Sequence, residues 1–107
     1  MGFDRDALAA AVARHGRVIR VVIAAIQGSS PREVGAAMLV WEGGQSGTIG
    51  GGALEYEAAA QARRIKSARL SRHPLGPQLG QCCGGAVTLL SEVYDAAALA
   101  RLEGDVV

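Results

Sequence analysis

Two long apolar runs in the chain predict strands that lie in the core. Residues 17–26 read RVIRVVIAAI and are apolar almost without interruption from Val21 onward. A continuous β-branched run of this kind is typical of a strand that is buried on both faces. Residues 86–94 are rich in leucine and β-branched side chains and predict another strand. Between these runs, residues 36–41 predict a short strand that a hairpin-like turn joins to residues 46–49.

Helical spacing of apolar positions predicts the helices. A first helix precedes these strands and ends where His15 is followed by Gly16, because glycine readily adopts the left-handed conformation that closes a helix. Residues 53–66 are rich in alanine and place apolar side chains at helical intervals, which predicts a second helix. Asp95 has the side chain of an N-cap for a final helix over residues 96–102.

These elements predict a single α/β domain with a mixed sheet of about four strands and two or three helices. At 107 residues, the chain has the length of one domain. Residues 71–81 contain prolines and glycines and are expected to form a loop. Half of the residues are hydrophobic but only 4% are aromatic, so the core must be built from alanine and branched aliphatic side chains.

A run of basic residues covers the end of the predicted second helix and the residues after it. The run consists of Arg63, Arg64, Lys66, Arg69 and Arg72. We expect it to form the solvated face and C-terminal end of that helix, where cations interact favourably with the helix dipole. The alternative is a docking patch for an acidic partner. The whole chain carries a formal charge of only +1, so the strong basic excess of nucleic-acid-binding domains is absent.

Composition also indicates the compartment. No segment approaches the roughly 20 apolar residues that span a bilayer, and the first residues lack the pattern of a secretory signal. The two cysteines, Cys82 and Cys83, are adjacent, a spacing at which a disulfide between them would be strained. We therefore expect a protein of the reducing cytoplasm that binds neither membrane nor nucleic acid.

Three loops interrupt apolar elements with residues that expose backbone or reactive groups. One of them, residues 47–52, ends in three consecutive glycines directly before the predicted second helix. Unpaired N–H groups at a helix start, together with the helix dipole, favour an anion such as phosphate at Gly50, Gly51 and Gly52. A tight strand-to-helix turn without a ligand has the same sequence pattern. Neither the dinucleotide-binding fingerprint nor the P-loop lysine motif occurs.

The other two loops carry reactive side chains. Ser29 and Ser30 supply hydroxyl donors and Arg32 a guanidinium suited to phosphate or carboxylate, although a Ser-Pro turn with a surface arginine fits equally. The thiolate of Cys82 or Cys83 would be a soft ligand for a transition metal, or a carrier of sulfur. Zinc is not indicated, because no second Cys/His pair with finger-like spacing exists. The alternative for each cysteine is a small buried hydrophobic side chain.

Taken together, three segments resemble the XdhC/CoxI family of accessory proteins for xanthine dehydrogenase and carbon monoxide dehydrogenase. They are GSSPREVGAAMLV at residues 28–40, GTIGGGALE at residues 47–55 and LGQCCGG at residues 79–85. Their order and spacing fit the N-terminal domain of the family, so the resemblance covers most of residues 5–95. Each motif alone is weak, whereas all three in sequence are specific. The resemblance implies that three separated loops meet at one site.

The resemblance implies an accessory protein, not an enzyme, that binds the molybdenum cofactor (molybdopterin, a pterin phosphate that holds molybdenum through a dithiolene). Such a protein protects the cofactor while a cysteine desulfurase supplies the terminal sulfur ligand. It then delivers the cofactor to an apo-molybdoenzyme of the xanthine dehydrogenase type. Cys82 or Cys83 would contact the metal, with no basis for choosing between them. The implied cofactor contacts are Ser29, Ser30, Arg32, Gly50, Gly51, Gly52, Glu55, Gln81, Cys82, Cys83 and Gly84.

The sequence departs from the longer members of this family in one respect. Those members carry a second, dinucleotide-binding domain, and this sequence stops at Val107 without it. We therefore expect an N-terminal domain alone over residues 1–107 and transfer no nucleotide-linked behaviour to it. The resemblance leaves open whether the chain forms a homo-oligomer.

Two other classes of function fit the same residues. A small thiol-dependent sulfur transferase would use Cys82 or Cys83 as nucleophile, and it would need a lowered thiol pKa and a positioned base. His73 precedes the cysteines and is the histidine available as that base, since His15 is explained by the end of a helix. A protein-interaction domain would use the glycine loops only to shape a partner surface and would bind the apo-dehydrogenase without binding free cofactor.

Overall fold

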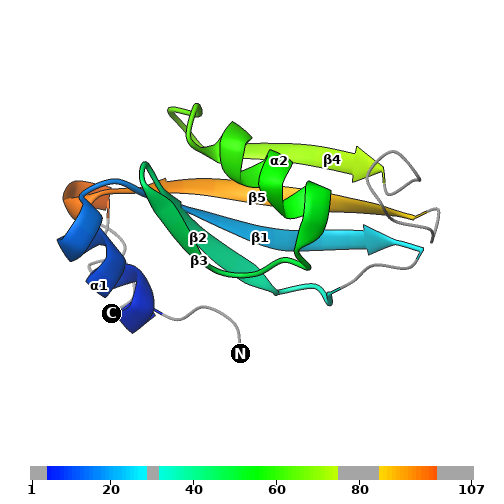
Figure 1. The fold of residues 1–107 in the computed structure, drawn as a ribbon, viewed down its shortest axis with the longest axis horizontal. Coiled ribbons are helices and arrows are strands. Elements are labelled where there is room, and N and C mark those ends of the chain that lie inside the picture. The colour runs from blue at the N-terminus through cyan, green and yellow to red at the C-terminus, as the bar shows by residue number, and fades with distance from the viewer. Residues whose placement is uncertain (1–4, 29–31, 75–84, 99–107) are drawn as a thin grey trace.

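The computed structural model describes residues 5–28, 32–74 and 85–98, which form two helices and five strands (Figure 1). In chain order these elements are α1 (Arg5–His15), β1 (Val18–Gln27), β2 (Ala37–Trp41), β3 (Gly44–Gly47), α2 (Gly52–Ala62), β4 (Arg69–Pro74) and β5 (Ala86–Tyr94). A further helical turn begins after Asp95, whose carboxylate accepts a hydrogen bond from the Ala98 N–H at 2.8 Å, as predicted for an N-cap. In the described parts of the chain, the helices are too short or too polar to cross a membrane.

The five described strands form one sheet in the order β3-β2-β1-β5-β4, and every neighbouring pair is antiparallel (Figure 1). The predicted small α/β domain is confirmed, with five strands where about four were expected. The prediction of a mixed sheet was wrong. The helix α2 connects β3 at one edge of the sheet with β4 at the other edge, so this strand–helix–strand unit creates no parallel pair.

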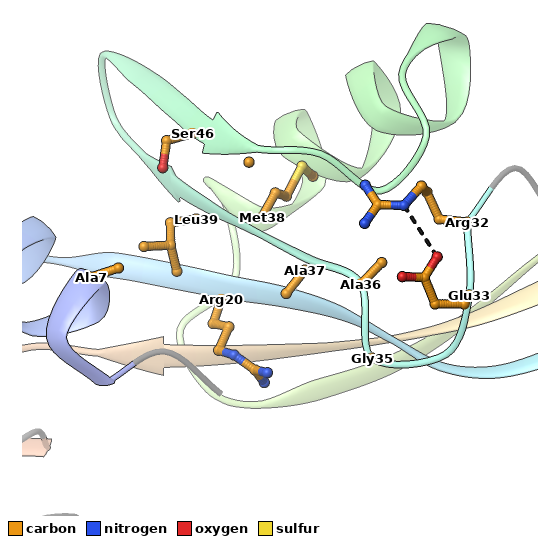
Figure 2. Close-up of a pocket in the computed structure, with 11 residues that line it drawn as sticks. Ala7, Arg20, Arg32, Glu33, Gly35, Ala36, Ala37, Met38, Leu39 and Ser46 are labelled. Atoms are coloured by element: carbon orange, nitrogen blue, oxygen red, sulfur yellow. Dashed lines mark hydrogen bonds and ion pairs between the residues drawn. The ribbon is translucent and has the colours of Figure 1, made fainter. Parts of the chain in front are cut away.

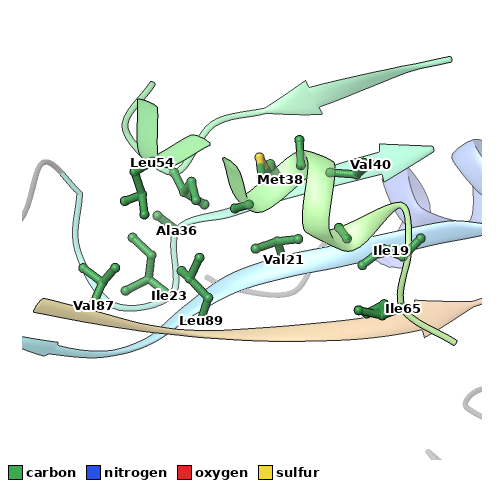
Figure 3. Close-up of a cluster of buried hydrophobic side chains, with 14 residues drawn as sticks. Ile19, Val21, Ile23, Ala36, Met38, Val40, Leu54, Ile65, Val87 and Leu89 are labelled. Carbon is green, nitrogen blue, oxygen red and sulfur yellow. The ribbon is translucent and has the colours of Figure 1, made fainter. Parts of the chain in front are cut away.

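The main core lies between α2 and one face of the sheet (Figure 3). Alternate residues of β1 point to this face, and Leu54 of α2 is completely buried there. As expected from the composition, aliphatic and alanine side chains fill the space. The cluster consists of Ile19, Val21, Ile23, Ala36, Met38, Val40, Ile49, Leu54, Ala58, Ala59, Ala62, Ile65, Val87 and Leu89.

The helix α1 covers one end of the opposite face of the sheet. It ends as predicted, because Gly16 has a φ of 86° and its N–H donates to the carbonyl oxygen of Val12 at 2.8 Å. The imidazole of His15 stacks on the indole of Trp41, with ring centroids 4.0 Å apart and planes 8° apart. A smaller cluster of buried side chains lies beneath this helix and consists of Leu8, Val12, Val18 and Tyr94.

The segment that follows α2 differs from its prediction. The helix expected over residues 53–66 ends at Ala62, and the loop expected over residues 71–81 begins as strand β4. The expectation that the basic run forms the end of a helix was therefore wrong for Lys66, Arg69 and Arg72, which lie beyond α2. Pairing with β5 outweighs the local preference for a turn, and an edge strand tolerates both exposed cations and a proline at its last position.

Replacing Leu54 by alanine is expected to lower the free energy of unfolding by about 2–5 kcal/mol, because a fully buried side chain would leave a cavity in the main core. Chemical denaturation followed by circular dichroism measures this loss. The matched control on the same helix is Tyr56→Ala, whose side chain is 78% exposed and whose loss should stay below about 0.5 kcal/mol. Equal losses in the two variants would contradict the packing face assigned to α2.

Candidate functional site

The glycine loop, residues 47–52, joins β3 to α2 and adopts backbone angles that suit glycine alone. Gly47, Gly50, Gly51 and Gly52 all have positive φ, between 68° and 131°. Gly47 is also limited by space, because a Cβ atom there would lie 2.9 Å from the carbonyl oxygen of Ala37. The glycines of this segment therefore have a conformational cause that is independent of any ligand.

The carboxylate of Glu55 organises the glycine loop. Its Oε1 accepts hydrogen bonds from the Thr48 hydroxyl and from the backbone N–H groups of Ile49 and Gly51, the latter two at 3.1 and 3.0 Å. Its Oε2 accepts a hydrogen bond from Gln45 Nε2 at 3.0 Å. Partial burial raises the pKa of Glu55, but the hydrogen bonds from the Thr48 hydroxyl and the two loop amides outweigh it, so the pKa lies below its ordinary value of 4.5. The ionised carboxylate thus holds the loop from within.

Three successive backbone N–H groups of the loop donate hydrogen bonds to side chains. The Gly50 N–H donates to Thr48 Oγ1 at 3.0 Å, and its neighbours Ile49 and Gly51 donate to Glu55. Among the three glycines predicted to bind an anion, Gly52 is the one whose N–H finds no acceptor within the described residues. The side chains of Thr48 and Glu55 therefore accept two of the three glycine N–H groups that the sequence pattern assigned to a bound anion.

Arg32 reaches the glycine loop from the connection between β1 and β2. Its Nη1 donates to the carbonyl oxygen of Thr48 at 3.2 Å. Its Nε donates to the Glu33 carboxylate at 3.3 Å (Figure 2). A hydrogen bond from its own backbone amide and the nearby Arg32 guanidinium lower the pKa of Glu33. Both side chains line a cavity of about 340 Å³ beside β2 and β3, together with Arg20 and Gly47 (Figure 2). The guanidinium is thus positioned by a carbonyl on one side and a carboxylate on the other.

The residue that precedes the serine motif lies beside the residue that follows the cysteine motif. The pairing of β1 with β5 sets Gln27 opposite Ala86. One residue further along each strand, a Cβ atom on Gly28 would lie 3.0 Å from the Cα of Gly85. Arg72 links β4 to β1 at this end of the sheet, because its Nη2 donates to Gln27 Oε1 at 2.9 Å. These residues line a second cavity of about 320 Å³.

Six of the predicted site residues lie outside the described residues: Ser29, Ser30, Gln81, Cys82, Cys83 and Gly84. The nearest residues that the structure describes are Gly28, which directly precedes the serines, and Gly85, which directly follows the cysteine motif. Of the other predicted residues, it links Arg32 to the glycine loop and places Glu55 at the centre of that loop. Within residues 5–28, 32–74 and 85–98, no three His, Cys, Asp or Glu side chains gather in a way that would hold a metal ion.

His73, the histidine considered as a base for a cysteine, lies on β4 and faces α2. Its Nε2 is 2.8 Å from the Ser71 hydroxyl oxygen. Burial lowers the pKa of His73, while the negative charge of Glu57 acts in the opposite direction. In the described part of the chain, the hydrogen-bond partner of this imidazole is therefore a serine.

The sequence indicated no role in the site for Gln45 or Thr48, and it placed Arg72 only in the basic run. Thr48 lies within the glycine motif, and its hydroxyl and the carboxylate of Glu55 lie on either side of the three glycines. A hydroxyl donor and a carboxylate acceptor on either side of a glycine turn were the sequence feature that could have indicated the role of Thr48. Arg72 offered no such signal, because its contact with Gln27 exists only when β4 and β1 both flank β5.

A family model matches more than half of the chain. The model is that of the XdhC and CoxI family, and it matches residues 11–73. The matched region runs from α1 through β4 and contains Arg32, the glycine loop and Glu55. No match was found among curated proteins.

A solved structure has the same fold. It is a crystal structure described as a xanthine dehydrogenase from Bacillus halodurans, with a TM-score of 0.80 and 28% sequence identity. The alignment covers 95% of this chain and 33% of the other, so this chain spans about a third of the length of that protein. The likeness therefore extends over nearly all of the present sequence.

Lowering the pH is expected to destabilise the domain through Glu55. Its folded-state pKa lies below the ordinary value of 4.5, so the ionised carboxylate contributes stability above that pH and loses it as the pH falls through the folded-state pKa. Glu55→Gln should lower the free energy of unfolding at neutral pH by about 1–3 kcal/mol. The variant should also lose less stability on acidification than the parent protein.

Urea denaturation at a series of pH values measures both effects. The matched control is Glu42→Gln in the exposed turn between β2 and β3, which should leave the stability and its pH profile close to those of the parent. A pH profile of Glu55→Gln that coincides with the parent profile would show that Glu55 does not organise the loop.

Proposed function

Because the chain belongs to the XdhC and CoxI family, we propose that it is an accessory protein that handles the molybdenum cofactor for an enzyme of the xanthine dehydrogenase type. In this role it binds molybdopterin, assists its sulfuration and takes part in its insertion into the apo-enzyme. A cysteine desulfurase as the sulfur donor and the cytoplasm as the setting belong to the same proposal. The likeness to a chain described as a xanthine dehydrogenase supports a place in this enzyme system.

The observation that carries this proposal is that described residues next to the three motifs come together in two pairs. Gly28 and Gly85 come within contact distance where the serine and cysteine motifs begin and end. Arg32, at the far end of the serine motif, is hydrogen-bonded to the glycine loop. In our proposal the three segments supply hydroxyls, a guanidinium and thiols to one site, which is the set of groups that a phosphorylated, sulfur-ligated metal cofactor requires.

The predicted site residues differ in how well they suit the cofactor, and we assign them different roles accordingly. In our proposal, Arg32 and the Gly52 amide bind the anionic phosphate, because Gly50 and Gly51 already donate to side chains of the loop. Glu55 then acts as a positioning residue that holds the loop. Cys82 or Cys83 would contact molybdenum through its thiolate, with Ser29, Ser30, Gln81 and Gly84 as further contacts.

Replacing both Cys82 and Cys83 by alanine is expected to lower cofactor retention by about tenfold or more, since the soft metal ligand is lost. The measurement is the cofactor content of the purified protein after release and oxidation to a fluorescent pterin. The two single variants identify which cysteine matters, and circular dichroism checks that each variant is folded. Unchanged retention in the double variant would remove the cysteines from cofactor binding.

Arg32→Ala is expected to weaken retention of the cofactor, and Arg32→Lys should restore it only in part, because lysine lacks the planar fork that pairs with phosphate in two places. The expected loss for alanine is about tenfold. Arg14→Ala, at an exposed position on α1, is the matched control and should retain cofactor like the parent protein. If the two alanine variants behave alike, the anionic end of the cofactor is bound elsewhere.

A further inference from the structure

The strand β4 forms one edge of the sheet and has a neighbour on one side only. It pairs with β5, and in the part of the chain that the structure describes no strand lies along its other side (Figure 1). An edge strand of this kind presents backbone N–H and C=O groups that another extended chain can pair with. This edge is separate from the glycine loop and from Arg32, which lie beside β2 and β3.

The residues that lead into this edge and form it carry charge of one sign. Residues 63–74 contain five of the eleven basic residues of the chain and no acidic residue. Lys66 and Arg69 are exposed, as are Arg64 and Arg72, and within the described residues no carboxylate forms an ion pair with any of the four. Since Lys66, Arg69 and Arg72 lie beyond the end of α2, interaction with the helix dipole does not account for them.

Apolar surface and a cavity lie on either face of the same strand. Leu70 is 64% exposed on the face of the sheet that α2 leaves uncovered. On the other face, a cavity of about 340 Å³ lies between α2 and β4, and its lining includes Tyr56, Arg64 and His73 together with one carboxylate, that of Glu57. Tyr56 is 78% exposed at its rim. An added strand points its side chains alternately to the two faces, so each face offers an apolar contact.

We propose that the outer edge of β4 binds an extended, acidic polypeptide segment of a partner protein by strand addition. Main-chain hydrogen bonds to β4 hold the segment, and its carboxylates meet the surrounding cations. The partner is a polypeptide and not a nucleic acid, because the free strand edge and the exposed Leu70 and Tyr56 favour a pleated chain with alternating side chains. The modest net charge of the protein supports the same choice.

The experiment uses a fluorescein-labelled synthetic peptide in which glutamate alternates with valine, and a second peptide with lysine in place of glutamate. Fluorescence anisotropy with the full chain should show binding of the glutamate peptide only, and this binding should weaken as salt is added. Arg69→Glu should weaken it about tenfold. The matched control is Arg14→Glu, which changes the net charge equally at an exposed position on α1 and should leave the affinity within about twofold.

Hydrogen exchange identifies where the peptide lies. Bound peptide should protect those β4 amides that point away from β5, while amides already paired with β5 change little. Protection confined to another element would overturn the proposal, as would absence of binding or equal affinity for the two peptides. A single-stranded oligothymidine that binds with the same dependence on Arg69 and displaces the peptide would also overturn it, since the surface would then be a nucleic-acid site.

Discussion

The antiparallel pairing of β1 with β5 is the constraint on which the arrangement of the loops depends. β1 has a partner on each side, so the chain can turn away from the sheet only at the ends of this strand. At one end Gly28, with a φ of 77°, passes so close to Gly85 that a Cβ atom on Gly28 would lie 3.0 Å from the Cα of Gly85. Two connections that are far apart in the sequence therefore start from one place, and the backbone alone determines that they do.

Much of this fold could be predicted from the apolar pattern, and the exceptions share one cause. The strand at residues 86–94 and the end of α1 at Gly16 agree with the prediction because burial and a helix-closing glycine leave local signals. The strand β4 has no such local signal in its sequence. Its residues RLSRHP include exposed cations and a proline, and they form a strand only through pairing with β5. The antiparallel character of the sheet was equally invisible, since it depends on α2 crossing from one edge to the other.

The residues of the candidate site could be predicted from the sequence more readily than the hydrogen bonds between them. Arg32 and the glycine loop were recognised from their chemistry, and the structure adds the hydrogen bond that joins them. Glu55 was expected to contact a cofactor, yet its described partners are the Thr48 hydroxyl, two amides of the glycine loop and the side chain of Gln45. Residue type alone does not distinguish these two roles, because a carboxylate that accepts hydrogen bonds from amides does so regardless of whether the amides belong to the same loop. The carboxylate of Glu55 therefore holds the loop through hydrogen bonds within the protein itself.

Trp41 is the single tryptophan of the chain, and its surroundings give it an optical use. Its indole lies against the imidazole of His15 on one side, and a Cβ atom on Gly44 would lie 3.2 Å from its Nε1. Its carbonyl oxygen accepts a hydrogen bond from Arg63 Nε at 2.9 Å. Intrinsic emission from this one fluorophore therefore reports on whether the N-terminal helix is seated against the sheet. The signal originates at the end of β1 opposite Gly28, so it responds to detachment of the N-terminal helix and not to rearrangement of the loop at Gly28.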